Sequence, residues 1–200
     1  QVTIFEALPD FLALADAEIA RAAAKEFKKQ GLDIRLGTKC TKTEVRGDEV
    51  VLTYVDANGE ATMAFDRLLV AVGRRAASEN CLAEGTGVQV DERGRYVVDD
   101  HNWTGVEGVW AVGDCVRGAM LAHKGSEEGI AVAEIIAGKP GHVNHDTIPW
   151  VIYTEPEIAW VGKTEAELKA GGIPYKTGSF PFAAIGRAVA MNETAGMVKV

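Results

Sequence analysis

An apolar run followed by Gly113-Asp114 is the part of this sequence whose residue types best suit ligand binding. The run at residues 108–112 predicts a buried strand, and ligands of open α/β sheets bind at the carboxyl ends of the strands. An ionised Asp114 can only accept hydrogen bonds, which suits a hydroxyl-rich ligand such as a sugar or ribitol chain. Because Gly113 has no Cβ, a ligand can approach its backbone closely. The pattern therefore predicts a ligand site at Asp114.

The residues that follow predict a helix that begins near the same site. Apolar residues recur on one face of residues 127–138, and Gly138 is a helix stop. The start of this helix would direct a positive dipole and free N–H groups at the crevice. That arrangement suits the electron-rich pyrimidine end of a flavin.

Residues 113–129 carry three short motifs: Gly113-Asp114-Cys115, Met120-Leu121-Ala122-His123-Lys124 and Glu127-Glu128-Gly129. Together they resemble the second flavin motif of the dihydrolipoamide dehydrogenase family, one of the FAD-dependent pyridine nucleotide-disulfide oxidoreductases. The first motif is shared with glutathione and mercuric reductases, whereas the second is typical of the lipoamide branch. The resemblance implies FAD contacts at Asp114, Met120, Leu121, Ala122 and His123. The structural alternative is that Asp114 caps a turn while Met120 and Leu121 pack in the core.

Residues 1–73 have the pattern of the C-terminal part of a nucleotide-binding domain. A helix begins after Asp16, a plausible N-cap, and stops at Gly31, and Asn58-Gly59 is a hairpin signal. The strand-like segments are 2–5, 34–36, 40–45, 49–55, 61–65 and 68–72, the last of them predicted to be buried. This βαβ unit with an antiparallel meander resembles the NAD domain of the same family.

Glu6 stands at the carboxyl end of the first strand-like segment. The resemblance implies that its carboxylate hydrogen-bonds the adenine-ribose hydroxyls and repels a 2′-phosphate, which predicts NAD rather than NADP. The resemblance also places backbone contacts to NAD at Cys40 and Gly73. The alternatives are a solvated Glu6 at a strand exit and a simple turn role for Gly73. We expect Arg74 and Arg75 to serve in positioning and surface charge rather than in chemistry.

The rest of the sequence resembles two further parts of the family. Residues 74–143 correspond to the FAD-binding central segment, and residues 144–200 to the N-terminal part of a dimerisation domain. A helix is expected there after the capping box at Thr164, with a stop at Gly171. Four aromatic residues are expected to be interface anchors or core: Trp150, Trp160, Phe180 and Phe182. The predicted fold class is α/β, with a partial Rossmann-type NAD domain and β-meander, an FAD-domain return segment, and the start of an α+β dimerisation domain.

The sequence offers no candidate catalytic acid, base or nucleophile. The family reaction needs two closely spaced cysteines for a redox disulfide, whereas Cys40, Cys81 and Cys115 lie far apart. It also needs a His oriented by a Glu. His123 and Glu128 have the spacing of that dyad, but a helix turns about 500° over it, so the two side chains should point apart. We therefore assign no catalytic residue and no metal site.

Composition excludes several classes of partner. The net charge of −8 argues against nucleic acid or an anionic membrane, and no apolar run approaches the roughly 20 residues that span a bilayer. Scattered cysteines fit a reducing compartment, which we expect to be the cytoplasm or, in a eukaryote, the mitochondrial matrix. Strand patterns begin next to Gln1 and stop at Val200, so we expect an internal fragment of a larger protein.

The resemblance implies a fragment of an oxidoreductase that oxidises protein-bound dihydrolipoyl groups with NAD⁺, through an active-site disulfide and FAD. Its implied partners are the lipoyl domains of 2-oxo acid dehydrogenase complexes and a second copy of the chain in a homodimer. One alternative is another FAD disulfide reductase or an NADH oxidase. The other is a non-catalytic oligomerisation module. We expect the fragment alone to be inactive, because half of each nucleotide site would lie outside it.

Overall fold

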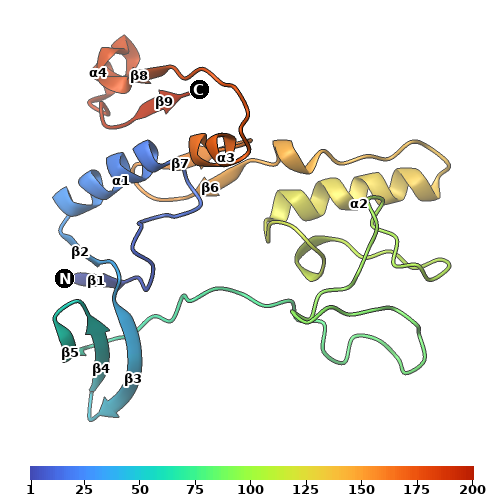
Figure 1. Ribbon diagram of the computed structural model, residues 1–200, viewed down its shortest axis with the longest axis horizontal. Coiled ribbons are helices and arrows are strands. Elements are labelled where there is room, and N and C mark those ends of the chain that lie inside the picture. Colours follow the sequence, from blue (N-terminus) through green and yellow to red (C-terminus); the bar gives the residue numbers. More distant parts are fainter. The chain divides into compact units, whose positions relative to one another are not determined.

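The computed structural model describes residues 1–200. Their contacts divide the chain into two compact units, of which the first contains Gln1–Val70 and Val151–Val200 and the second contains Ala71–Trp150. Both helices and strands are present, so the predicted α/β class is confirmed (Figure 1). None of the helices has the length and apolar character that crossing a membrane requires.

The first unit begins with the predicted βαβ arrangement. Strand β1 (Val2–Phe5) pairs in parallel with β2 (Leu32–Arg35), and α1 (Ala17–Lys29) connects them. The Asp16 side chain accepts the Glu18 N–H at 2.9 Å, which confirms it as the N-cap of α1. The buried face of α1 then forms the centre of a small core, in which Ala23 and Phe27 pack with Ile158.

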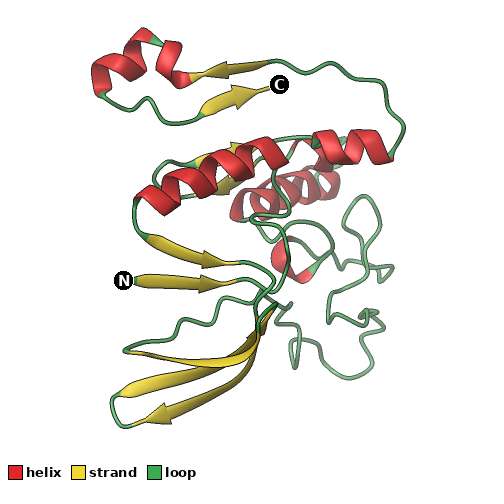
Figure 2. Cartoon of the chain, turned by 60° about the vertical axis from the view of Figure 1, so that its left-hand side comes forward, coloured by secondary structure: helices red, strands yellow, loops and turns green.

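The predicted meander is also confirmed. Strands β3 (Lys39–Arg46), β4 (Glu49–Asp56) and β5 (Gly59–Phe65) form an antiparallel sheet in the order β3-β4-β5 (Figure 2). The sheet packs against the βαβ unit through aromatic rings: the Phe5 ring centroid lies 5.0 Å from that of Tyr54 and 6.0 Å from that of Phe65. These contacts place the start of β3 beside the end of β1.

Two expected buried strands do not form, and those predictions are wrong. Residues 68–72 have no strand pairing, and Leu69 and Val72 are 90% and 94% exposed. Residues 108–112 contribute only an isolated bridge between Trp103 and Trp110. A strand needs a neighbour to accept and donate its backbone hydrogen bonds, and this chain supplies no strand beside either segment. An apolar run predicts that a segment is buried, but it does not show whether a neighbouring strand is present to form backbone hydrogen bonds with it.

The second unit contains one α-helix, α2 (Ala122–Ile136), with the 3₁₀ turns η1 (Gly113–Cys115) and η2 (His145–Thr147). The helix begins several residues before the predicted start at residue 127. Its buried residues are Lys124, Glu128 and Ala131, which lie on one helical face. Because two of these positions carry charged side chains, the apolar pattern does not reveal the first turns of the helix.

The C-terminal part of the chain contains short elements. Strand β6 (Trp150–Ile152) pairs with β7 (Ile158–Trp160), and β8 (Ser179–Pro181) pairs antiparallel with β9 (Met197–Lys199). Helix α3 (Glu165–Ala170) has the predicted capping box between Thr164 and Glu167, and Gly171 is its C-cap. A second short helix, α4 (Gly186–Met191), follows the turn η3 (Phe182–Ala184) and was not predicted.

Gly141 lies where a loop approaches α2 too closely for any side chain. A Cβ at this buried position would lie 2.0 Å from the carbonyl oxygen of Ala131, which is helix backbone and cannot move aside. We expect Gly141→Ala to lower the free energy of unfolding by about 1–3 kcal/mol or more, as overpacking does. Urea denaturation followed by tryptophan fluorescence measures it. The control is Gly129→Ala on α2, where the added Cβ would have no neighbour within 4 Å. This variant should have unchanged or higher stability. An equal loss of stability in both variants would contradict the close packing at Gly141.

A partly buried cation connects three elements of the first unit. The Lys199 ammonium on β9 lies 2.9 Å from Asp16 Oδ1, at the start of α1, and 2.8 Å from Glu165 Oε2, at the start of α3. Glu165 also accepts a hydrogen bond from the Tyr175 hydroxyl and pairs with Lys169. The bonds from Lys169, Lys199 and Tyr175 lower the pKa of Glu165 to about 2.

This cluster predicts a stability that depends on acid pH. The pKa of Glu165 is lower in the folded chain than in the unfolded one, so its stabilising contribution is present above the unfolded pKa of about 4.3. It is lost as the pH falls towards the folded value of about 2. We expect the melting temperature to fall over this range in the wild type and to fall less in Glu165→Gln. Glu193→Gln, at an exposed position, should behave as the wild type; identical slopes for all three proteins would contradict the prediction.

Candidate functional site

The predicted ligand residue Asp114 is presented by a sharp turn. Val112 is extended, Gly113 has a φ of 80°, and η1 follows at once. A positive φ of this size favours glycine, because a Cβ would be strained there. The Asp114 side chain is 53% exposed, and its nearest charged neighbour is Arg74, with Nη1 3.7 Å from Oδ2. The carboxylate is therefore available to accept hydrogen bonds from a ligand.

Arg74 lies between the two halves of the predicted motif. In addition to its contact with Asp114, its Nη2 donates to the carbonyl oxygen of Met120. The guanidinium is thus beside both the turn and the segment that leads into α2. This placement agrees with the positioning role expected of Arg74.

The other four predicted FAD residues lie at the N-terminus of α2. Leu121 is the N-cap, it is extended, and it provides no side-chain cap. The first N–H groups of a helix have no carbonyl partner within the helix, so they remain available to a ligand. The His123 ring is occupied elsewhere, since its Nε2 lies 2.6 Å from the Pro149 carbonyl oxygen. The His123 ring is thus engaged within the unit, whereas the first N–H groups of α2 have no carbonyl partner within the helix.

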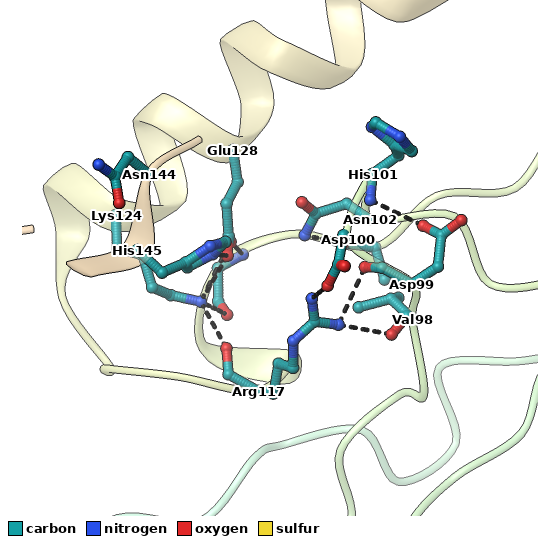
Figure 3. Close-up of polar contacts among 12 residues, drawn as sticks. Val98, Asp99, Asp100, His101, Asn102, Arg117, Lys124, Glu128, Asn144 and His145 are labelled. Atoms are coloured by element: carbon teal, nitrogen blue, oxygen red, sulfur yellow. Dashed lines mark hydrogen bonds and ion pairs between the residues drawn. The ribbon is translucent and has the colours of Figure 1, made fainter. Parts of the chain in front are cut away.

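Behind this surface, α2 carries an ion pair that the residue pattern did not reveal. The Lys124 and Glu128 side chains are 0% and 1% exposed, and Lys124 Nζ lies 3.0 Å from Glu128 Oε1 (Figure 3). Lys124 also donates to the carbonyl oxygens of Gly113 and Arg117, each at 3.0 Å. The sequence signal was a Lys–Glu pair at i,i+4, but such pairs are usually exposed on a helix surface.

Glu128 is surrounded by donors. Its Oε2 accepts the Gly113 N–H at 2.7 Å, and its Oε1 lies 3.1 Å from Nε2 of His145. Burial alone would raise the pKa of this carboxyl, but the bonds from Gly113, His145 and Lys124 outweigh burial and hold the pKa below its usual range. Glu128 is therefore ionised and paired inside the unit.

Arg117 connects this cluster to the preceding loop. Its guanidinium donates to the carbonyl oxygen of Asp99 at 2.9 Å and to the carboxylate of Asp100 at 2.6 Å, while its own carbonyl accepts from Lys124 (Figure 3). The segment 113–117 is thus anchored to the preceding loop by the Arg117 side chain and to α2 by Lys124.

The predicted NAD residues Glu6 and Cys40 lie near each other in the first unit. The Glu6 carbonyl accepts the Thr38 N–H at 2.9 Å, which places the start of β3 at the end of β1. The Glu6 carboxylate accepts the Leu8 N–H at 2.8 Å through Oε1, and Oε2 has no such bond. Cys40 is exposed on β3. Gly73 has a φ of 117° and belongs to the second unit.

His123 and Glu128 have different partners. The His123 ring contacts Pro149, whereas Glu128 contacts Lys124 and His145. All three cysteines are free thiols. Burial raises the pKa of the Cys115 thiol, which disfavours the reactive thiolate form.

Two family models match the chain. Residues 1–129 match the pyridine nucleotide-disulphide oxidoreductase family, and residues 148–200 match the dimerisation domain of the same family. Together they cover both units of the structure.

Individual relatives agree with this match. The chain is 50% identical over 200 residues to dihydrolipoyl dehydrogenase of Cupriavidus necator, covering 100% of the chain and 42% of the relative. It is 41% identical over 202 residues to mitochondrial dihydrolipoyl dehydrogenase of Pisum sativum, covering 100% of the chain and 40% of the relative. Among solved structures, the HOCl-induced flavoprotein disulfide reductase RclA from Escherichia coli superposes with a TM-score of 0.86 at 31% identity, over 100% of this chain and 45% of that one. The chain therefore spans less than half the length of each.

Proposed function

Because this chain belongs to the pyridine nucleotide-disulphide oxidoreductase family, we propose that it is part of a longer flavoenzyme that oxidises protein-bound dihydrolipoyl groups with NAD⁺. The observation that carries the proposal is the pairing of an exposed Asp114 carboxylate with the uncapped N-terminus of α2 on the same turn-and-helix unit. The identity to dihydrolipoyl dehydrogenases over the whole chain supports the choice of substrate.

The residues present fit FAD. Asp114 offers acceptors for the hydroxyl groups of a ribityl chain, since an ionised carboxylate can only accept. The N-terminus of α2 offers N–H donors and the positive end of a helix dipole, which suits the electron-rich pyrimidine edge of a flavin. Asp114, Met120, Leu121, Ala122 and His123 would hold FAD, which supplies the electron transfer between dithiol and nicotinamide when bound.

Glu6, Cys40 and Gly73 form the proposed NAD contacts. One oxygen of the Glu6 carboxylate already accepts the Leu8 N–H, which orients the group at the end of β1 and leaves the other oxygen to accept from a ribose hydroxyl. The negative charge would repel a 2′-phosphate, so NAD rather than NADP is proposed.

Glu6→Gln should therefore raise the KM for NAD⁺ of the full-length enzyme by about tenfold, since a hydrogen bond to a charged group is worth about 1.5–3 kcal/mol. It should also reduce the discrimination against NADP⁺. Steady-state kinetics with both nucleotides measure the two effects. Glu49→Gln, at an exposed position on β4, is the matched control, and equal KM values for the two variants would remove Glu6 from the site.

The proposal extends to organisation and partners. We propose an NAD-domain part at residues 1–73, an FAD-binding central segment at 74–143 and the N-terminal part of a dimerisation domain at 144–200. The match of residues 148–200 to the family's dimerisation domain supports a homodimer. The lipoyl domains of 2-oxo acid dehydrogenase complexes are the proposed protein substrates, in the cytoplasm or the mitochondrial matrix.

Substrate assays on the full-length enzyme test this function. We expect reduction of NAD⁺ with dihydrolipoamide and no comparable turnover with glutathione disulfide or with O₂. The likeness to a flavoprotein disulfide reductase makes a different disulfide substrate the competing result, and preference for it would replace the lipoamide assignment. The 200-residue chain alone should show no turnover, and measurable activity would contradict the proposed division of the nucleotide sites.

A further inference from the structure

The backbone of Gly113 is contacted by two side chains of α2, one at its N–H and the other at its carbonyl oxygen. Its N–H donates to Glu128 Oε2 at 2.7 Å, and its carbonyl oxygen accepts from Lys124 Nζ at 3.0 Å. These are charge-assisted hydrogen bonds, which are stronger than bonds between neutral groups. Both side chains are almost fully buried, so water does not compete for the contacts.

The Lys124 ammonium also reaches the other side of the turn. It donates to the Arg117 carbonyl at 3.0 Å, so its three protons serve Gly113, Arg117 and Glu128. Asp114 lies between the two contacted carbonyls and is 53% exposed. The pair therefore holds the backbone on both sides of Asp114 while its carboxylate stays open to a ligand.

A third contact comes from the helix backbone. A Cβ on Gly125 would lie 3.1 Å from the Gly113 Cα, so α2 approaches the turn closely at this point. The backbone of Gly113 is thus approached by three residues near the start of α2: Lys124, Gly125 and Glu128. Helix and turn form one local unit.

Stability alone does not account for a buried ion pair here. Removing two charges from water costs several kcal/mol, and well-packed apolar residues of similar volume are often at least as stabilising. An apolar pair cannot provide an acceptor for the Gly113 N–H or a donor for the Gly113 carbonyl oxygen.

We propose that Lys124 and Glu128 are positioning residues that fix the Gly113–Cys115 turn in its ligand-binding shape before the flavin arrives. This rests on the proposed FAD role of Asp114. A turn that is already ordered loses little conformational freedom on binding, so more of the contact energy at Asp114 appears as affinity.

A double-mutant cycle on the full-length flavoenzyme tests the proposal. Glu128→Gln should raise the dissociation constant for FAD about tenfold, as the loss of a charged hydrogen bond does. In an Asp114→Ala background it should change that constant less than about twofold, because the residue through which it acts is absent. Additive effects of the two substitutions would overturn the proposal. Flavin fluorescence during titration of the apoprotein gives the constants.

A second readout needs no flavin. In the apoprotein, hydrogen exchange of the Gly113 and Asp114 amides should be about tenfold faster in Glu128→Gln than in the wild type. Glu134→Gln, at an exposed position on the same helix, should leave both exchange and FAD binding unchanged. Unaltered exchange at Gly113 in Glu128→Gln would overturn the positioning role.

If Glu128→Gln does not fold, the paired apolar variant Lys124→Met/Glu128→Leu takes its place in both measurements. It removes both charges and leaves the Gly113 N–H and carbonyl oxygen without these partners. We expect faster Gly113 exchange and weaker FAD binding in this folded variant, and wild-type values would overturn the proposal. The Asp114→Ala variant distinguishes failure of the proposed function from failure of the positioning role. If Asp114→Ala alone binds FAD as tightly as the wild type, the proposed FAD role of Asp114 is wrong, whatever the effect of Glu128→Gln on hydrogen exchange at Gly113.

Discussion

Glu128→Ala is expected to lower the free energy of unfolding by about 3–5 kcal/mol, because removing one partner of a buried ion pair leaves the other charge uncompensated. Lys124 would remain at 0% exposure without a counter-ion. Gly113 N–H would also lose its acceptor. Few single substitutions have so large an effect.

Urea denaturation of the chain, followed by tryptophan fluorescence, measures this loss. Glu127→Ala is the matched control on the adjacent exposed position, and it should remain within about 0.5 kcal/mol of the wild type. The double variant Lys124→Met/Glu128→Leu should be more stable than Glu128→Ala, because no buried charge is left unpaired, but less stable than the wild type, because the Gly113 N–H and carbonyl oxygen lose their partners. If Glu128→Ala lowered the free energy of unfolding no more than Glu127→Ala does, the result would contradict the buried Lys124–Glu128 ion pair.

Asp114→Ala is expected to weaken FAD binding by the full-length enzyme by about 10- to 100-fold. In the wild type the Asp114 carboxylate would accept hydrogen bonds from the ribityl hydroxyl groups of FAD. Each hydrogen bond to a charged acceptor contributes about 1.5–3 kcal/mol, and the variant would lose this contribution. The side chain is 53% exposed and has no short hydrogen bond of its own, so its removal should not disturb the fold.

The flavin content of the purified protein and a titration of the apoprotein with FAD measure this effect. Asp146→Ala is the control, since Asp146 is another exposed aspartate of the second unit. Its flavin content should match that of the wild type. Flavin retained by Asp114→Ala to the same extent as by Asp146→Ala would contradict the site.

Much of the fold could be predicted from the sequence, because its signals are local. The N-cap at Asp16, the hairpin turn at Asn58-Gly59 and the capping box at Thr164 each involve a few neighbouring residues, and each appears in the structure as predicted. The motif around Asp114 likewise indicated the family that the comparisons show.

Strand pairing and burial could not be predicted in the same way. The apolar runs at 68–72 and 108–112 have strand-like composition, but a strand forms only beside another strand. The predicted helix start at residue 127 was late for a related reason: the buried face of α2 begins with Lys124 and Glu128, which a pattern of apolar residues passes over.

The amino-acid sequence by itself determined the family, the helix caps at Asp16 and Thr164 and the meander, because residues close in the chain carry those signals. Only the tertiary structure decided that Lys124 and Glu128 are buried and that both contact the backbone of Gly113. Burial of a charge depends on which distant backbone groups reach it, and for Glu128 these come from a turn fifteen residues away along the chain. No local pattern contains that information.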